Sequence, residues 1–221
     1  MFTLQAGSQA RAEITVKRSR FIATLQRTDT AEQARSEITR VKREFPDARH
    51  NCSAFVIARN QGPSTTHSSD DGEPPGTAGS PILEVLLGAS LVDVTAVVTR
   101  YFGGVLLGTG GLVRAYTDAT RAAVSAASLV RLESLRKVKV WVPLRVAGRF
   151  EADVHGLGWP VLESFWGPEL ALTLALKETQ VSELSELAAD LSRSPATLED
   201  LGQTTLEVPV SNPFATSTLR S

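Results

Sequence analysis

The sequence of 221 residues lacks several features that would assign a protein to a class at once. It has one cysteine, Cys52, which excludes an internal disulfide and is typical of a reducing compartment. No apolar run approaches the roughly 20 residues of a bilayer span, and no basic–apolar leader opens the chain. We therefore expect a cytoplasmic protein without membrane contact. A net charge of -1 excludes a globally basic nucleic-acid-binding protein, and 42% hydrophobic residues exclude a disordered chain.

Glycine and charge are distributed unevenly along the chain. Nine of the 16 glycines fall between Gly72 and Gly111. Residues 1–60 contain 11 lysines and arginines against 6 acidic residues, a balance of +5, whereas residues 61–133 and 134–221 each have a balance of -3. The near-neutral total therefore conceals a basic amino-terminal segment and a glycine-rich, acidic middle.

Hydrophobic periodicity predicts two domains, residues 1–133 and 134–210, followed by a flexible tail, residues 211–221. In the first domain, Thr30 and Gln33 form a capping box at the start of a helix, with Ala34, Ile38 and Val41 on its apolar face. The remaining predicted elements are strands over 13–17, 21–25, 52–58 and 92–99, helices over 80–87 and 112–127, and loops over 60–79 and 100–110.

The second domain repeats the pattern in a different order. Strands over 137–144, 159–165, 169–176 and 204–210 alternate with two helices, one after the first strand and one after the third. This β-α-β-β-α-β order predicts a ferredoxin-like fold, so the fold class is α+β.

The loop over 60–79 contains three carboxylates within four residues, Asp70, Asp71 and Glu73. Such a cluster either ligates a hard cation or acts in acid–base chemistry, or else it caps a helix and binds a basic partner. The amides of residues 76–80, at the start of the next helix, either hold an anion or simply form a tight turn, for which Ser80 and Pro81 supply the helix start.

The loop over 100–110 lies between a buried strand and a helix, but it has no P-loop or dinucleotide fingerprint. We expect Phe102 to lie in the core, and Arg100 and Tyr101 to face a partner. Arg114 either contributes to that surface or pairs with Asp118 on its helix.

Other candidate chemistry is limited. His50 and Cys52 share one face of a strand, an arrangement expected of a structural pair rather than a zinc or nucleophile site. No Gly-x-Ser-x-Gly nucleophile elbow is present, so hydrolase chemistry of that kind has no support.

Several ordered motifs resemble those of the IMPACT/YigZ family, and in particular of its bacterial two-domain members. They are Ser19-Arg20-Phe21-Ile22-Ala23, Ala48-Arg49-His50-Asn51-Cys52, Asp70-Asp71-Gly72-Glu73-Pro74 with Gly76-Thr77-Ala78-Gly79, and Val98-Thr99-Arg100-Tyr101-Phe102-Gly103-Gly104 through Gly108, Gly110, Gly111, Arg114 and Tyr116.

The resemblance implies an amino-terminal two-layer α/β domain of the ribosomal-protein type and a ferredoxin-like second domain. It also implies a link to translation, because eukaryotic members regulate translation by competing for an activator of a stress kinase. Two positions depart from the family pattern: Pro75 stands where serine is usual, and Leu106 stands where lysine is usual.

Three hypotheses follow. The first is a non-enzymatic binding protein linked to translation, which contacts RNA, the ribosome or a protein, and needs no metal or cofactor. The second is a metal-dependent, peptidase-like hydrolase centred on Asp70, Asp71 and Glu73, and the third is a protein-only adaptor. For the first, the candidate surface combines the family motifs (His50, Asp70, Asp71, Gly72, Glu73, Pro74, Gly76, Thr77, Gly79, Arg100, Tyr101, Phe102, Gly103, Gly104, Gly108, Gly110, Gly111, Arg114 and Tyr116) with a basic face (Lys17, Arg18, Arg20, Arg35, Arg40, Lys42 and Arg43).

Overall fold

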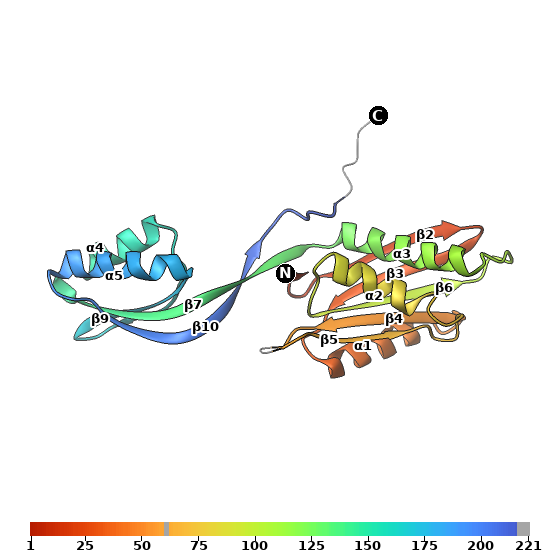
Figure 1. The fold of residues 1–221 in the computed structure, drawn as a ribbon, viewed down its shortest axis with the longest axis horizontal. Coiled ribbons are helices and arrows are strands. Elements are labelled where there is room, and N and C mark those ends of the chain that lie inside the picture. Colours follow the sequence, from red (N-terminus) through yellow and green to blue (C-terminus); the bar gives the residue numbers. More distant parts are fainter. Residues whose placement is uncertain (60–61, 216–221) are drawn as a thin grey trace, which may run out of the picture. The chain divides into compact units, whose positions relative to one another are not determined.

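The structure is a computed structural model that describes residues 1–59 and 62–215. It divides the chain into two compact units (Figure 1). Unit 1 comprises Met1–Arg131 and the chain from Val208 onward, and unit 2 comprises Leu132–Glu207. The α+β class expected from the sequence is confirmed. No helix among the described residues is both long and apolar enough to cross a membrane.

Unit 1 contains a five-stranded antiparallel sheet and three helices. The strands are β2 (Gln9–Val16), β3 (Ser19–Arg27), β4 (His50–Ile57), β5 (Thr65–Ser69) and β6 (Val94–Tyr101), and the helices are α1 (Ala31–Glu44), α2 (Gly79–Gly88) and α3 (Thr109–Ala126). The strands lie in the order β2-β3-β6-β4-β5.

Helices cover both faces of this sheet. The central strands β4 and β6 are buried along nearly their whole length, which requires cover on each side. Ala34 and Ile38 of α1 pack against Phe55 and Ile57 on one face, while α2 and α3 lie on the other (Figure 1). Unit 1 therefore has three layers rather than the two that the resemblance implied.

Local signals explain most elements of unit 1. The hydroxyl of Thr30 accepts a hydrogen bond from the Gln33 amide at 3.2 Å, and α1 begins at the next residue, as the capping box predicts. β5 was not predicted, because it lies within the expected loop 60–79 and is a polar edge strand whose partner among the described strands is β4 alone. β6 also continues past Thr99, where the strand was expected to end, to Tyr101.

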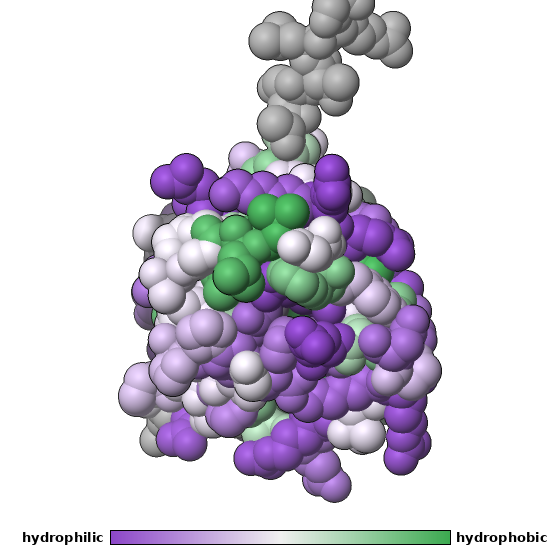
Figure 2. All heavy atoms as spheres, turned by 90° about the vertical axis from the view of Figure 1, so that its right-hand side faces the viewer, coloured by the Kyte–Doolittle hydropathy of each residue, from purple (hydrophilic) through white to green (hydrophobic). Residues whose placement is uncertain are grey.

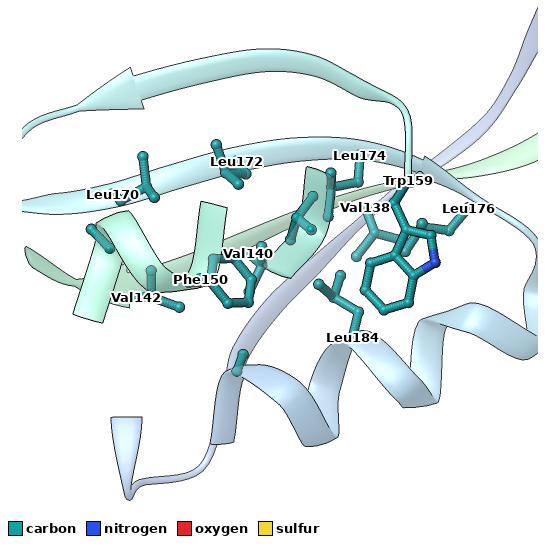
Figure 3. Packing of buried hydrophobic residues seen from close by; sticks show 13 residues of the cluster. Val138, Val140, Val142, Phe150, Trp159, Leu170, Leu172, Leu174, Leu176 and Leu184 are labelled. Atoms are coloured by element: carbon teal, nitrogen blue, oxygen red, sulfur yellow. The ribbon is translucent and has the colours of Figure 1, made fainter. Parts of the chain in front are cut away.

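Unit 2 has the predicted β-α-β-β-α-β order. Its elements are β7 (Leu129–Pro143), α4 (Leu144–Gly156), β8 (Val161–Trp166), β9 (Glu169–Leu176), α5 (Glu178–Ser192) and β10 (Thr197–Pro209), of which β7 and β10 extend into unit 1. The strands lie in the order β10-β7-β9-β8, which confirms the ferredoxin-like fold. Alternate residues of β7 and β9 point toward Phe150 of α4 and Leu184 of α5, with Trp159 closing the core (Figure 3).

Two short segments complete unit 1. β1 (Phe2–Leu4) pairs antiparallel with the first residues of β7. The side-chain amide of Asn212 donates to the carbonyls of Val124 and Ala127 at 2.8 Å each, and Phe214 meets Phe2 edge-on at 5.9 Å between ring centroids. Residues 212–214 of the expected flexible tail are thus anchored to α3 and β1, while residues 216–221 of that tail lie outside the described residues.

Candidate functional site

The sequence motifs meet at one end of the unit 1 sheet, the end that faces the viewer in Figure 2. Arg100, near the end of β6, pairs in register with Phe21 of β3 on one side and His50 of β4 on the other. Two loops join this end: the acidic loop, residues 70–78, before α2, and the glycine loop, residues 102–108, before α3. The turn between β2 and β3 lies directly beside the glycine loop. A Cβ atom added at Gly103 would stand only 2.0 Å from the backbone of Arg18.

Asp70 holds the start of α2. Its carboxylate accepts hydrogen bonds from the backbone amides of Gly76, Ala78 and Gly79 at 2.8–3.0 Å. Partial burial opposes ionisation, but these three donors lower the pKa of Asp70 below its usual value, so the carboxylate stays charged. Of the two alternatives for residues 76–80, an anion site or a simple tight turn, the amides hold an anion, and it is the carboxylate of Asp70. Asp70, rather than the expected Ser80, caps the helix.

Asp71 ties the acidic loop to β4 and α1. Its side chain accepts a hydrogen bond from the backbone amide of Asn51 at 2.7 Å and forms an ion pair with Lys42 at 2.6 Å. Its backbone carbonyl lies 2.8 Å from Nδ1 of His50. Asp71 has φ of +46° and Gly72 has φ of +86°, so the loop turns sharply here, where glycine is favoured.

Glu73 is the centre of a buried polar chain. Its Oε1 forms an ion pair with Arg100 at 2.6 Å and accepts a hydrogen bond from the hydroxyl of Tyr116 at 2.8 Å. The side chains of Arg100 and Glu73 are only 8% and 3% exposed. Burial, with Cys52 and Glu73 close by, raises the pKa of Tyr116 far above its usual range, so its hydroxyl remains a donor. The expectation that Arg100 faces a partner is wrong. Its guanidinium is buried and lies close to the rings of Phe21 and Phe102.

All three carboxylates of the acidic loop are bound by groups of the protein itself. Asp70 holds backbone amides, Asp71 holds Lys42, and Glu73 holds Arg100. Within residues 1–59 and 62–215, no three histidine, cysteine, aspartate or glutamate side chains are grouped so as to hold a metal ion. These contacts hold the acidic loop in place, and Thr77 closes it through a 2.7 Å hydrogen bond to the carbonyl of Pro74.

The glycine loop presents apolar side chains to solvent. Phe102, expected in the core, is 43% exposed, and its ring lies 5.7 Å from the Arg100 guanidinium. Tyr101 is half-buried and donates to Asp47 at 2.9 Å. Val105 and Leu106 are also exposed, and the sequence hypotheses did not include them as site residues. The signal that would have found them is the apolar run Val105-Leu106-Leu107 inside an otherwise glycine-rich loop.

The other glycines and motif residues shape the start of α3. Gly104 and Gly108 have φ of +83° and +73°, and Gly108 caps the helix that contains Gly110 and Gly111. Tyr116 of α3 is fully buried, whereas Arg114 of the same helix is exposed. The alternative pairing of Arg114 with Asp118 is not found in the described part of the chain.

The expected basic face separates into paired and unpaired cations. Arg20 binds Glu13 through two hydrogen bonds, Arg40 binds both Glu37 and Glu44, and Lys42 binds Asp71. Lys17, Arg18, Arg35 and Arg43 make no ion pair with any described residue. Arg35 and Arg43 line a shallow hollow on α1 together with Arg40, while Lys17 and Arg18 form the β2–β3 turn.

Cys52 is expected to be unreactive in the folded protein. Its thiol is buried against the Asp70 carbonyl and the Tyr116 hydroxyl, at 2.9 and 3.2 Å from Sγ, and burial raises its pKa to about 12. At pH 8 the thiolate fraction is then about a thousandfold below that of an ordinary cysteine. Labelling with iodoacetamide, followed by mass spectrometry, should be negligible in buffer and complete in urea; equal rates in the two conditions would contradict this burial.

Together, the fold and this loop-covered end define a two-unit α+β protein with a buried ionic scaffold beneath an exposed surface. The sequence matches the Impact N-terminal domain over residues 17–124. It is 38% identical over 178 residues to the IMPACT family member YigZ of Escherichia coli, which covers 80% of this chain and 87% of that protein. It is 34% identical over 200 residues to the IMPACT family member YvyE of Bacillus subtilis, which covers 90% of this chain and 91% of that protein.

A solved structure described as that of a hypothetical protein is similar to this chain with a TM-score of 0.57 and 35% sequence identity. The similarity covers 89% of this chain and 95% of that one. The chain belongs to the IMPACT family.

Proposed function

We propose that this protein is a non-enzymatic binding protein linked to translation, and that its unpaired cations contact the phosphates of RNA, free or within the ribosome. The observation that carries the proposal is the set of four cations, Lys17, Arg18, Arg35 and Arg43, that no acidic side chain in the described residues neutralises. Unpaired arginines and lysines are available to replace the counterions of a phosphate backbone. The link to translation rests on family membership.

The occupied carboxylates support a binding role over a catalytic one. A general base needs a carboxylate that reaches the substrate, and a metal ligand needs carboxylate oxygens that are free for the cation. Asp70, Asp71 and Glu73 instead each bind another part of unit 1. The hydrolase alternative therefore has no observation in its favour.

The test is RNA binding at several salt concentrations. The full chain is titrated into a fluorescein-labelled single-stranded oligouridine, with sedimentation with ribosomes as a second assay. Charge reversal of Arg35 and Arg43 together (Arg35→Glu, Arg43→Glu) is expected to weaken binding at least tenfold and to reduce the slope of log K against log salt by about 1–2, because two phosphate contacts are lost.

The matched control is Arg149→Glu, a charge reversal at an exposed arginine of α4 in unit 2. It should leave both the affinity and the salt slope unchanged. The absence of binding to oligouridine and to ribosomes, even at low salt, would overturn the proposal.

A protein-only adaptor is a second candidate function. It is favoured by the exposed apolar side chains of the glycine loop, since phosphate contacts do not require aliphatic residues.

A further inference from the structure

Four exposed apolar side chains lie close together in sequence at the motif-bearing end of unit 1. We call Phe102, Val105, Leu106 and Val113 the apolar tip; they are 43%, 39%, 83% and 39% exposed. Figure 2 shows apolar side chains gathered on this face beside strongly hydrophilic ones. A single exposed leucine is ordinary, but a contiguous group of large apolar side chains on a soluble surface is typical of an interaction site.

The base of the apolar tip, at Phe102 and Gly103, is fixed to the sheet beneath it. The Gly103 amide donates to the Ser19 hydroxyl at 3.1 Å, and Gly103 packs directly on the backbone of Arg18. Phe102 lies over Arg100, which the buried Glu73 holds in place. This anchored base is already ordered, so it loses little conformational entropy on binding.

The unpaired charges nearest the apolar tip are positive. Lys17 and Arg18 form the turn on which Gly103 packs, and Arg114 follows Val113 on α3. All three are exposed and make no ion pair with a described residue. The nearby acid Glu13 is already bound by Arg20. A partner that buries the apolar tip therefore binds more tightly if acidic side chains surround the apolar residues that it presents.

We propose that the apolar tip is a docking site for a protein segment that presents leucine-like side chains flanked by aspartate or glutamate, in the form of an acidic amphipathic helix. Three of the four side chains are aliphatic. Nucleic-acid bases stack on aromatic rings, so an aliphatic surface favours apolar protein side chains over bases as its partner. The inference deepens the adaptor candidate, on which it rests, because it names the chemistry of the protein partner. It shares Lys17 and Arg18 with the RNA proposal, but its apolar residues and the pair Arg35 and Arg43 belong to one proposal each.

The probe is a fluorescein-labelled synthetic helical peptide with leucines on one face and glutamates on the other, titrated with the full chain. Two variants of this peptide, one with lysine for each glutamate and one with serine for each leucine, should each bind at least tenfold more weakly. Leu106→Ser should weaken binding of the original peptide about tenfold to a hundredfold, the value of burying one leucine side chain. Leu157→Ser, at an exposed leucine of unit 2, is the matched control and should have no effect.

Further measurements separate the alternatives. Charge reversal at Arg35 and Arg43 should leave peptide binding intact even where it abolishes RNA binding, so the two proposals fail independently. Equal binding of the serine-containing peptide, or no effect of Leu106→Ser, would overturn the docking site. If Leu106→Ser weakens oligouridine binding instead, the surface belongs to nucleic acid. If sedimentation velocity shows a dimer that Leu106→Ser dissociates, the occupant is a second copy of the chain; either result refutes the proposal.

Discussion

Exchanging Glu73 for glutamine is expected to destabilise unit 1 by about 3 kcal/mol, because it leaves the Arg100 guanidinium buried without its counter-charge. Nε of Arg100 already has no hydrogen-bond partner within the described residues, so the guanidinium depends on Glu73 for its compensation. Glutamine keeps the size of the side chain and an oxygen that accepts from Tyr116. The predicted loss therefore measures the charge rather than a cavity.

The distribution of aromatic residues makes this test specific. Trp141, Trp159 and Trp166 all lie in unit 2, while both tyrosines lie in unit 1. In urea, the Glu73→Gln variant should show an earlier circular-dichroism transition and an unchanged tryptophan fluorescence transition. The matched control is Glu13→Gln, which removes the counter-charge of an exposed pair with Arg20 and should leave both midpoints nearly unchanged. Equal midpoints for Glu73→Gln and Glu13→Gln would show that the buried pair contributes nothing.

Replacing Gly103 with alanine is expected to cost about 3 kcal/mol, because the added methyl group would stand 2.0 Å from the carbonyl carbon of Arg18 and 2.4 Å from the amide nitrogen of Ser19. Both neighbours are backbone atoms, which cannot rotate away as a side chain does. The β2–β3 turn and the glycine loop must therefore separate, and the hydrogen bond from Gly103 to Ser19 is lost.

Hydrogen exchange is the appropriate measurement for this variant, because the damage is local. Peptides that cover the β2–β3 turn and the end of β6 should exchange faster in Gly103→Ala, and those from unit 2 should not change. Gly110→Ala is the control: a methyl group there meets no atom within 4 Å, and alanine favours the helix in which Gly110 lies. Wild-type exchange rates around Gly103→Ala would refute the predicted clash.

Much of the fold was predictable because it follows local rules. The capping box of Thr30 and Gln33 located α1, and apolar alternation located the strands of unit 2 and hence the ferredoxin-like order. β5 was missed because an edge strand need not be apolar. The cover on both faces of the unit 1 sheet was missed because it depends on which helix packs against which side of β4.

The candidate site was predictable in its membership but not in its contacts. The sequence placed Asp70, Asp71 and Glu73 in one loop, but their side-chain partners lie 6 to 43 residues away in the chain, and only the folded chain brings them together. Arg100 and Phe102 were assigned to the wrong sides for a simple reason. β6 continues to Tyr101, so Arg100 is still part of the covered sheet, paired with Phe21 and His50. Phe102 follows the end of the strand and is exposed.

The order of synthesis has a consequence for unit 1. Asn212 binds the carboxyl end of α3 and Phe214 packs on Phe2, yet both residues follow the whole of unit 2 in the chain. On the ribosome, unit 2 therefore emerges complete before unit 1 receives its last contacts. The nascent chain passes through a stage in which the ferredoxin-like unit has all of its residues and the motif-bearing unit still lacks the segment that closes it.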